Sequence, residues 1–310
     1  GTYDTSGSAI DVALSADGNT AFVADDTGGL KIIDVVDPAA NGAASIATAP
    51  SLIGTYDTST SLDTVSSRHV TLSADGNTAF VAYGQDDLRI LDVSNPASPS
   101  LIATYDAGSG DVSCVTLSAD GNTAFVTKDI TGLLIVDVSN PASPSLTATL
   151  ETSGLAQDVT LSADGNTAFV ADYQDGLQII DVSNPASPSL TATLDNPTPY
   201  NNSFARNVIL SADGNTAFVS ESGAGLRIID VSNPASPSVI TENLSYGAND
   251  VALSADGNTA FVANGDDGLE IVDISNLASP ALTATFDTTG RAIAVTLSAD
   301  GNTAFVADGS

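Results

Sequence analysis

The sequence predicts an all-β fold, a seven-bladed β-propeller, and three observations lead to this prediction. The string Leu-Ser-Ala-Asp-Gly-Asn-Thr-Ala-Phe-Val occurs seven times without a change, beginning at Leu14, Leu72, Leu117, Leu161, Leu210, Leu253 and Leu297. Each copy lies in a repeat of about 45 residues that contains four short segments rich in β-branched residues, and no stretch has helical period. Such repeats are typical of propellers, because one small sheet cannot bury both faces until neighbours stack on it.

The repeat at 155–195 illustrates the four strands of a blade. They are expected at 158–161, 167–171, 177–182 and 189–194. Asp164-Gly165-Asn166 is expected to turn between the first and second strands, because Gly and Asn adopt positive φ at little cost. Pro185 and Pro188 place a loop between the third and fourth strands, since proline cannot donate to a strand ladder.

The closing blade is predicted to be incomplete. The sequence holds seven first and seven second strands but six third strands, and residues 1–5 repeat the fourth-strand sequence of residues 54–58. We therefore expect residues 1–5 to complete the blade that begins near Ala292, which lacks its third strand. Three explanations stay open: a sequence cut short, a three-stranded blade, or a strand supplied by another chain or another part of this one.

An unpaired sheet edge is a template for strand addition, so an assembly edge is predicted in this blade. It comprises Thr303, Ala304, Phe305, Val306, Ala307 and Asp308. Residues 1–310 form one propeller domain on this interpretation. Because the sequence starts without Met and in the middle of a repeat, we expect it to be part of a longer protein.

Charge and composition exclude several classes of partner. The chain has 38 acidic and 7 basic residues and a formal net charge of −31, which repels phosphate backbones and anionic lipid surfaces, so no nucleic acid is expected. No apolar run approaches the roughly 20 residues that span a bilayer, so no membrane insertion is expected. The single cysteine, Cys114, excludes an internal disulfide. Divalent cations, cationic surfaces or salt water suit such an acidic surface.

A second recurrent string connects the chain to a known family. Leu-x-Ile-x-Asp-Val-Ser-Asn-Pro occurs at 88–96, 133–141, 177–185 and 226–234, with weaker copies at 30–38 and 269–277. It resembles the LVIVD repeat of bacterial and archaeal surface proteins. The resemblance implies an extracellular or cell-surface propeller and implies no particular activity.

One position of the innermost strands predicts a ring of polar side chains at the mouth of the central channel. The residues directly before the recurrent Val are Asp11, His69, Cys114, Asp158, Asn207, Asp250 and Ala294. Carboxylate, imidazole and thiolate groups could share a metal ion there. The alternative is that these polar groups hydrogen-bond a neighbouring loop or channel water.

The loops after the second and fourth strands vary between copies, so they form the face on which binding could be installed. Its candidate residues are Asp25, Asp26, Tyr83, Asp86, Asp87, Tyr173, Asp175, Tyr200, Asn201, Asn202, Asp266 and Asp267. Carboxylates and amides suit Ca²⁺, and Tyr and Asn suit polar ligands such as glycans. The alternative is that Asp and Gly are present because they make turns.

Three functions remain in order of preference. The first is an extracellular, non-catalytic module for interaction or surface assembly, self-associating through the closing blade or binding a surface protein. The second is Ca²⁺-dependent adhesion to a glycan or protein, and Ca²⁺ is the one cofactor considered. The third is metal-dependent hydrolysis at the ring. We do not expect an enzyme, because no nucleophile motif or phosphate-binding glycine loop is present.

Overall fold

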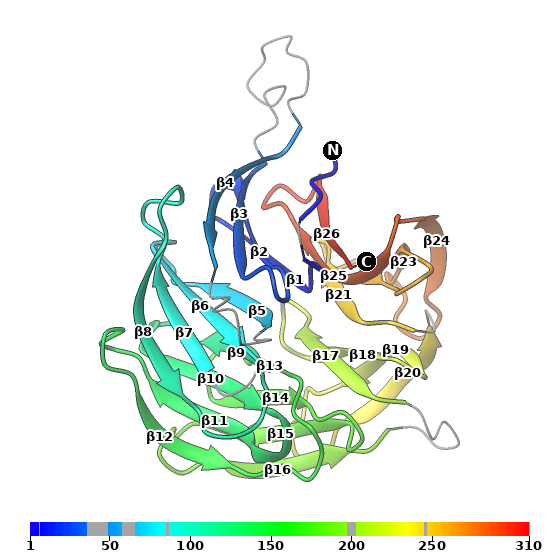
Figure 1. The fold of residues 1–310 in the computed structure, drawn as a ribbon. Helices are drawn as coiled ribbons and strands as arrows, with labels where there is room; N and C mark the ends of the chain where they lie inside the picture. The colour runs from blue at the N-terminus through cyan, green and yellow to red at the C-terminus, as the bar shows by residue number, and fades with distance from the viewer. Residues whose placement is uncertain are drawn as a thin grey trace.

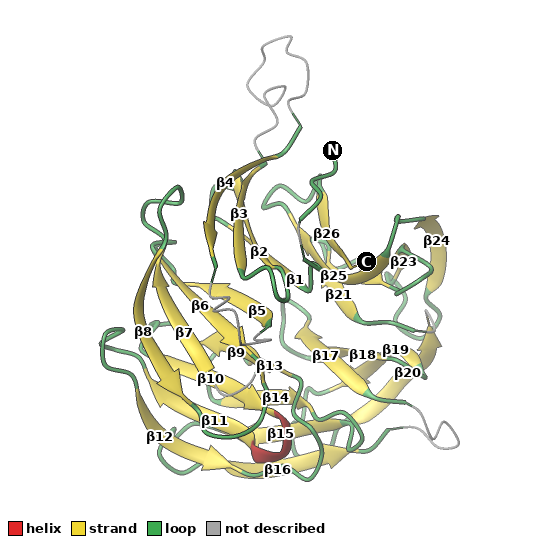
Figure 2. Ribbon diagram, viewed as in Figure 1, coloured by secondary structure: helices red, strands yellow, loops and turns green. Residues whose placement is uncertain are grey.

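The computed structural model describes residues 1–5, 7–35, 49–57, 66–84, 87–196, 203–244 and 247–309. It is an all-β propeller of six four-stranded antiparallel sheets and one two-stranded sheet, set radially about a centre (Figure 1). In the described part of the chain the one helical segment is the 3-10 turn η2, Asp129–Thr131 (Figure 2). No described helix is long and apolar enough to cross a membrane.

Each four-stranded sheet runs from its inner to its outer strand in chain order. The first three sheets are β1 (Asp11–Leu14), β2 (Thr20–Ala24), β3 (Leu30–Asp34) and β4 (Ser51–Tyr56); β5 (Ser67–Leu72), β6 (Thr78–Tyr83), β7 (Asp87–Asp92) and β8 (Ser100–Asp106); and β9 (Val112–Leu117), β10 (Thr123–Lys128), β11 (Gly132–Asp137) and β12 (Ser145–Leu150).

The remaining sheets follow the same order. They are β13 (Asp158–Leu161), β14 (Thr167–Ala171), β15 (Leu177–Asp181) and β16 (Ser189–Leu194); β17 (Ala205–Leu210), β18 (Thr216–Glu221), β19 (Gly225–Asp230) and β20 (Ser238–Leu244); β21 (Asp250–Leu253), β22 (Thr259–Ala263), β23 (Leu269–Asp273) and β24 (Ala281–Phe286); and the two-stranded β25 (Arg291–Leu297) and β26 (Ala304–Gly309). The strands predicted for the repeat at 155–195 are confirmed, and the third ends one residue earlier, at Asp181.

The recurrent turn between the first and second strands is held by its own side chains. Asp164 accepts hydrogen bonds from the Ser162 hydroxyl at 2.6 Å and from the backbone N–H and side-chain amide of Asn166 at 3.0 Å each. These bonds hold the pKa of Asp164 below its usual value. Gly165 has a φ of +70°, as the turn requires. The prediction that this string makes a turn is confirmed.

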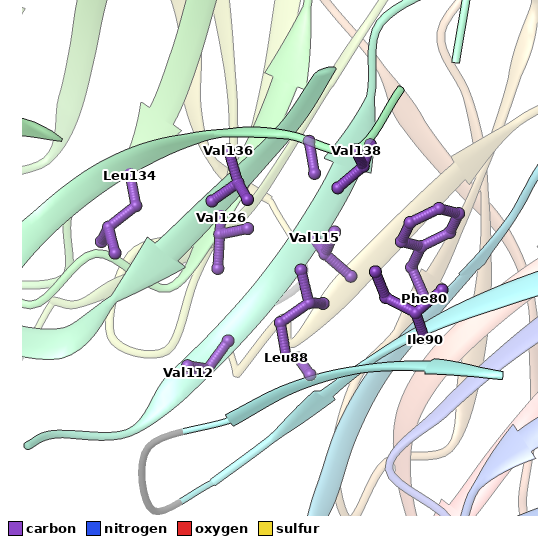
Figure 3. Close-up of a cluster of buried hydrophobic side chains, with 11 residues drawn as sticks. Phe80, Leu88, Ile90, Val112, Val115, Val126, Leu134, Val136 and Val138 are labelled. Atoms are coloured by element: carbon purple, nitrogen blue, oxygen red, sulfur yellow. The ribbon is translucent and has the colours of Figure 1, made fainter. Parts of the chain in front are cut away.

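The hydrophobic core is divided among the interfaces between neighbouring sheets. Figure 3 shows the cluster between the β5–β8 and β9–β12 sheets. The third strand contributes to two interfaces: Leu88 and Ile90 of β7 face the next sheet, while Leu91 and the adjoining Val93 face the preceding one. A third strand is therefore apolar on both faces, which explains its Leu-x-Ile-x-Asp-Val pattern.

The closing sheet differs from the prediction. The described residues give it two strands, β25 and β26, rather than three, and residues 1–5 are not a strand. The reason is physical: a fourth strand pairs with a third, and no described segment lies in ladder register between β26 and residues 1–5. The N-terminus lies beside β26 (Figure 1).

Candidate functional site

The polar ring at the inner strands links neighbouring sheets at several of its positions. Asp11 accepts a hydrogen bond from the Val70 backbone N–H at 2.9 Å, and Asp158 accepts one from Val208 at the same distance. His69 Nδ1 lies 3.4 Å from its donor, the Val115 backbone nitrogen. Each of these three side chains thus accepts a hydrogen bond from a backbone donor of the neighbouring inner strand, whereas the Asn207 amide donates to Asp158 at 3.1 Å. The partner in these bonds is the next inner strand, and the sequence had suggested a neighbouring loop or channel water.

The same ring lines a central cavity of about 690 Å³. Asp26, which follows a second strand, and Ser66, which precedes a first strand, also line it. The cavity therefore opens among the variable loops. Its volume is within the range of about 300–1,000 Å³ that is typical of small-molecule sites.

Three ring residues form the one group in the described chain that could hold a metal ion with three side chains. The ligand atoms of His69, Cys114 and Asp158 all lie within 4.8 Å of one another. A nitrogen, a sulfur and an oxygen ligand suit Zn²⁺ or a similar transition metal better than Ca²⁺, which prefers oxygen. Burial raises the pKa of the Cys114 thiol well above its usual value and also raises the pKa of Asp158. A metal would have to displace the thiol proton.

The pKa of the Asp250 carboxyl group in the ring is strongly raised. Burial, together with the charges of Asp11 and Asp158, raises its pKa from 3.8 to about 8, against the lowering effect of a 2.7 Å hydrogen bond from the Val295 backbone N–H. Asp250 is therefore mostly protonated at neutral pH.

Asp25, which was expected on the binding face, is instead structural, and Asp172 has the same role in another sheet. Asp25 is fully buried and accepts hydrogen bonds from the Thr5 hydroxyl at 2.5 Å and the Gly7 backbone N–H at 3.0 Å. Asp172 makes the same bonds to Thr152 and Gly154, at 2.8 and 2.9 Å. Burial raises the pKa of both, that of Asp172 to about 6. An acidic residue at this position thus holds, by hydrogen bonds, the segment that connects the preceding sheet to its own sheet.

Tyr83 and Tyr173, which were expected to contact a ligand, pack against other residues of the fold. Tyr83 is fully buried, and the Cζ atom of the Arg89 guanidinium lies 4.2 Å from the centre of the Tyr83 ring. Tyr173 stacks on Phe204 at 4.2 Å, and it forms a β-bridge to Ala205 in the next sheet. Tyr173 has a positive φ of +46° at this bridge. Both tyrosines therefore serve contacts within the fold.

The other candidates on the variable face are dispersed. Asp26 bridges to Ser67, Asp87 lies 3.6 Å from Arg89, and Asp266 lies 3.2 Å from Arg291. Asp175 is half-buried and Asp267 is exposed. In the part of the chain that the structure describes, these acids do not form a three-ligand metal group. Asp86, Tyr200, Asn201 and Asn202 lie outside the described residues.

The predicted assembly edge corresponds to β26. β26 pairs with β25 on one side, and no strand in the described ranges pairs with its other side. The second-strand Phe is 1–2% exposed in the first five sheets, whereas Phe305 of β26 is half-buried. The interface between the β21–β24 sheet and the closing sheet has four buried apolar residues, Ala263, Leu269, Ala292 and Val295. A complete interface has nine to eleven.

Residues 1–5 lie where a fourth strand would end. Thr5 and Gly7 bind Asp25 as Thr152 and Gly154, which follow β12, bind Asp172. Tyr3 packs on the next interface cluster, as Leu150 of β12 does. The closing sheet thus has its first, second and fourth positions occupied and its third position open among the described residues.

The sequence did not reveal this role for the position three residues after the second-strand Phe. It holds Asp25, Tyr83, Lys128, Asp172, Glu221, Asn264 and Asp308. The available signal was the string Thr-Ser-Gly, which precedes the first strand in the two copies that use Asp25 and Asp172.

The chain belongs to the LVIVD repeat family. The family model matches residues 6–58, 69–107, 109–152, 153–196, 205–243 and 247–288. The closing sheet is outside these matches, in keeping with its lack of a Leu-x-Ile-x-Asp strand. No curated protein matches the sequence.

Solved structures share the fold at low identity. A periplasmic gluconolactonase of Pseudomonas aeruginosa is 18% identical with a TM-score of 0.71, covering 90% of this chain and 84% of the other. A functionally unknown protein of Desulfotomaculum acetoxidans is 16% identical with a TM-score of 0.72, covering 99% and 92%. A protein of Lactobacillus plantarum is 16% identical with a TM-score of 0.76, covering 92% and 86%. These similarities concern the fold alone.

Proposed function

We propose that this chain is an extracellular, non-catalytic interaction or surface-assembly module whose open β26 edge accepts an extended strand. The closing sheet would then become a seventh four-stranded blade. The observation that carries the proposal is that no strand within the described residues pairs with β26 on the side of the docked residues 1–5.

The neighbouring surfaces specify the chemistry of the incoming strand. In the complete interface between the β9–β12 and β13–β16 sheets, third strands supply Leu133 and Ile135 from one side and Ile180 and Val182 from the other. The two interfaces of the closing sheet have no such contribution from a third strand of their own sheet. The partner strand should therefore carry the pattern Leu-x-Ile-Ile-x-Val, apolar on both faces.

Burial of these side chains would drive binding. Fully burying one Leu, Ile or Val contributes about 1.5–3 kcal/mol, and the main-chain bonds to β26 fix the register. Ordering the incoming strand offsets part of this gain. Affinity should thus depend steeply on the apolar residues of the strand and weakly on the residues marked x.

A peptide with the sequence of residues 176–183, Gly-Leu-Gln-Ile-Ile-Asp-Val-Ser, tests the proposal. We expect saturable binding with one peptide per chain, measured by fluorescence anisotropy of the labelled peptide. A peptide with Leu177→Asp and Ile179→Asp is the matched control and should not bind. Absence of binding by the unaltered peptide would refute strand acceptance.

A variant chain with the nine-residue sequence of residues 175–183 fused after Ser310 provides the second control. The fused strand should occupy the edge in cis and abolish binding of the free peptide. The molar mass of the unextended chain across a concentration series then tests whether a second copy is a donor. Growth that the fused strand suppresses identifies self-assembly, whereas a constant monomer mass excludes a second copy of this chain as the donor.

An extracellular location is part of the proposal. It is supported by the family resemblance to surface proteins and by the acidic surface. Calcium-dependent adhesion remains the alternative, and stabilisation by millimolar Ca²⁺ in a thermal melt would favour it. The expected sites are on the variable face.

Metal-dependent hydrolysis is a second candidate, favoured by the cluster of His69, Cys114 and Asp158. Similarity to a gluconolactonase at 18% identity supplies the reaction to try first. Zn²⁺ binding that Cys114→Ser weakens, together with lactone hydrolysis that requires Zn²⁺, would support this candidate. Binding without turnover would leave a metal site and exclude the hydrolase.

A further inference from the structure

The cationic side chains of this acidic chain are distributed unevenly. Four of its seven basic residues are largely buried and serve the fold: Lys31, Arg89, Lys128 and Arg227. The three that reach solvent are Arg68, Arg206 and Arg291, and all three line the central cavity.

The three arginines approach the cavity from different directions. Arg68 is in β5, Arg206 in β17 and Arg291 in β25, which are inner strands of the second, fifth and seventh sheets. Around the ring of seven sheets they are separated by three, two and two steps. Guanidinium groups thus surround the cavity mouth.

Their existing partners leave capacity for a ligand. Among the described residues no carboxylate lies within ion-pair distance of Arg206, which is exposed. The pair of Arg291 with Asp266 is solvent-exposed, at 62% and 86%, and such pairs are weak and readily exchanged. Arg68 pairs with Asp111 and keeps 37% of its side chain exposed.

Three polar, uncharged side chains also line the cavity, those of Ser113, Gln157 and Asn249. Four carboxylates also border it, those of Asp11, Asp26, Asp158 and Asp250. Three of them, Asp11, Asp158 and Asp250, already accept a backbone N–H from the neighbouring sheet. Those bonds compensate part of their repulsion toward an anion.

We propose that the cavity mouth binds a small polycarboxylate, with Arg68, Arg206 and Arg291 as its anion contacts. A guanidinium presents a planar fork that matches a carboxylate in bidentate geometry. The cavity of about 690 Å³ is large enough for a small organic molecule. This site is independent of the β26 edge, and neither proposal depends on the other.

Isothermal titration with tricarballylate, which has three carboxylates, tests the site. Sorbitol is the neutral probe and inorganic phosphate the probe for another anion class. We expect tricarballylate to bind one per chain and sorbitol not to bind. The net charge of −31 disfavours anions elsewhere on the surface, so binding reports a local site.

Arg206→Gln should weaken tricarballylate binding at least ten-fold, and the triple Gln variant should abolish it. Gln174→Glu is the matched control: it makes the same charge change at an exposed position of the variable face that does not line the cavity, and it should alter the affinity less than two-fold. Circular dichroism and urea midpoints establish that the variants are folded. The proposal is overturned if tricarballylate does not bind, if phosphate binds and tricarballylate does not, or if Arg206→Gln and Gln174→Glu have equal effects.

Discussion

Replacing Asp250 by Asn should remove much of the pH dependence of stability. The pKa of Asp250 is raised from 3.8 to about 8 in the folded chain. Between these values the folded chain holds a proton that the unfolded chain releases, so stability falls as pH rises through this window and is constant above it. A shift of four pH units corresponds to about 6 kcal/mol.

We expect a smaller effect, about 2–3 kcal/mol, because Asp250 lines the cavity and water there solvates the ionised form. Asn resembles the neutral acid and keeps an oxygen that can accept the Val295 N–H. Asp250→Asn should therefore approach the wild type in stability at pH 5 and exceed it at pH 8.

Urea unfolding followed by far-ultraviolet circular dichroism at several pH values measures this difference. Asp250→Ala is the control, because it leaves the Val295 N–H without its acceptor and should destabilise the chain at both pH values. An identical pH slope for the wild type and Asp250→Asn would contradict the assignment of a neutral Asp250.

Two further substitutions test how the blades are held together. Arg227→Leu should lower the free energy of unfolding by about 3–5 kcal/mol, because it leaves the buried Glu221 carboxylate without the guanidinium that lies 2.7 Å away. The double variant Glu221→Gln with Arg227→Leu should recover part of this loss in urea melts. A cost below about 1 kcal/mol for the single variant would show that the pair is not buried in solution. Gly176→Ala should destabilise the chain more than Gly165→Ala. Both glycines have a positive φ, of +76° and +70°, but a methyl group at Gly176 would lie 2.3 Å from the Leu194 carbonyl oxygen, whereas the space around Gly165 is open. Equal melting temperatures for the two variants would refute this reasoning.

Sequence periodicity was sufficient to predict the strands. In the repeat at 155–195 the turn of Asp164, Gly165 and Asn166 and the two prolines divide the chain at the observed boundaries. These features act locally, so a single repeat contains the information. The structure explains the apolar pattern of the third strand by its burial on both faces.

The state of residues 1–5 could not be predicted in this way. Their likeness to residues 54–58 is real, and Thr5 and Tyr3 make the contacts of a fourth strand, but ladder formation requires a neighbouring strand that the described residues do not provide. Residues 1–5 would form a strand only beside a neighbouring strand, so their own sequence does not decide their structure.

The roles of the variable-face residues depended on tertiary structure. Asp25 and Asp172 resemble surface acids in sequence, yet each is buried against the connection from the preceding sheet. Tyr83 is covered by Arg89, which is six residues later in the sequence and lies diagonally across the β6–β7 ladder, opposite Val81. Such pairings become visible only when the sheets are stacked.

Hydrogen exchange of β26 tests the central claim most directly. β26 and its preceding residue carry the sequence Thr-Ala-Phe-Val-Ala, which is also the sequence of β14, a strand paired on both edges. Mass spectrometry should find faster amide exchange in Ala304–Gly309 than in Thr167–Ala171, and protection of β26 when the peptide Gly-Leu-Gln-Ile-Ile-Asp-Val-Ser is added. Equal, slow exchange in both strands without the peptide, or no added protection with it, would contradict an open edge that accepts a strand.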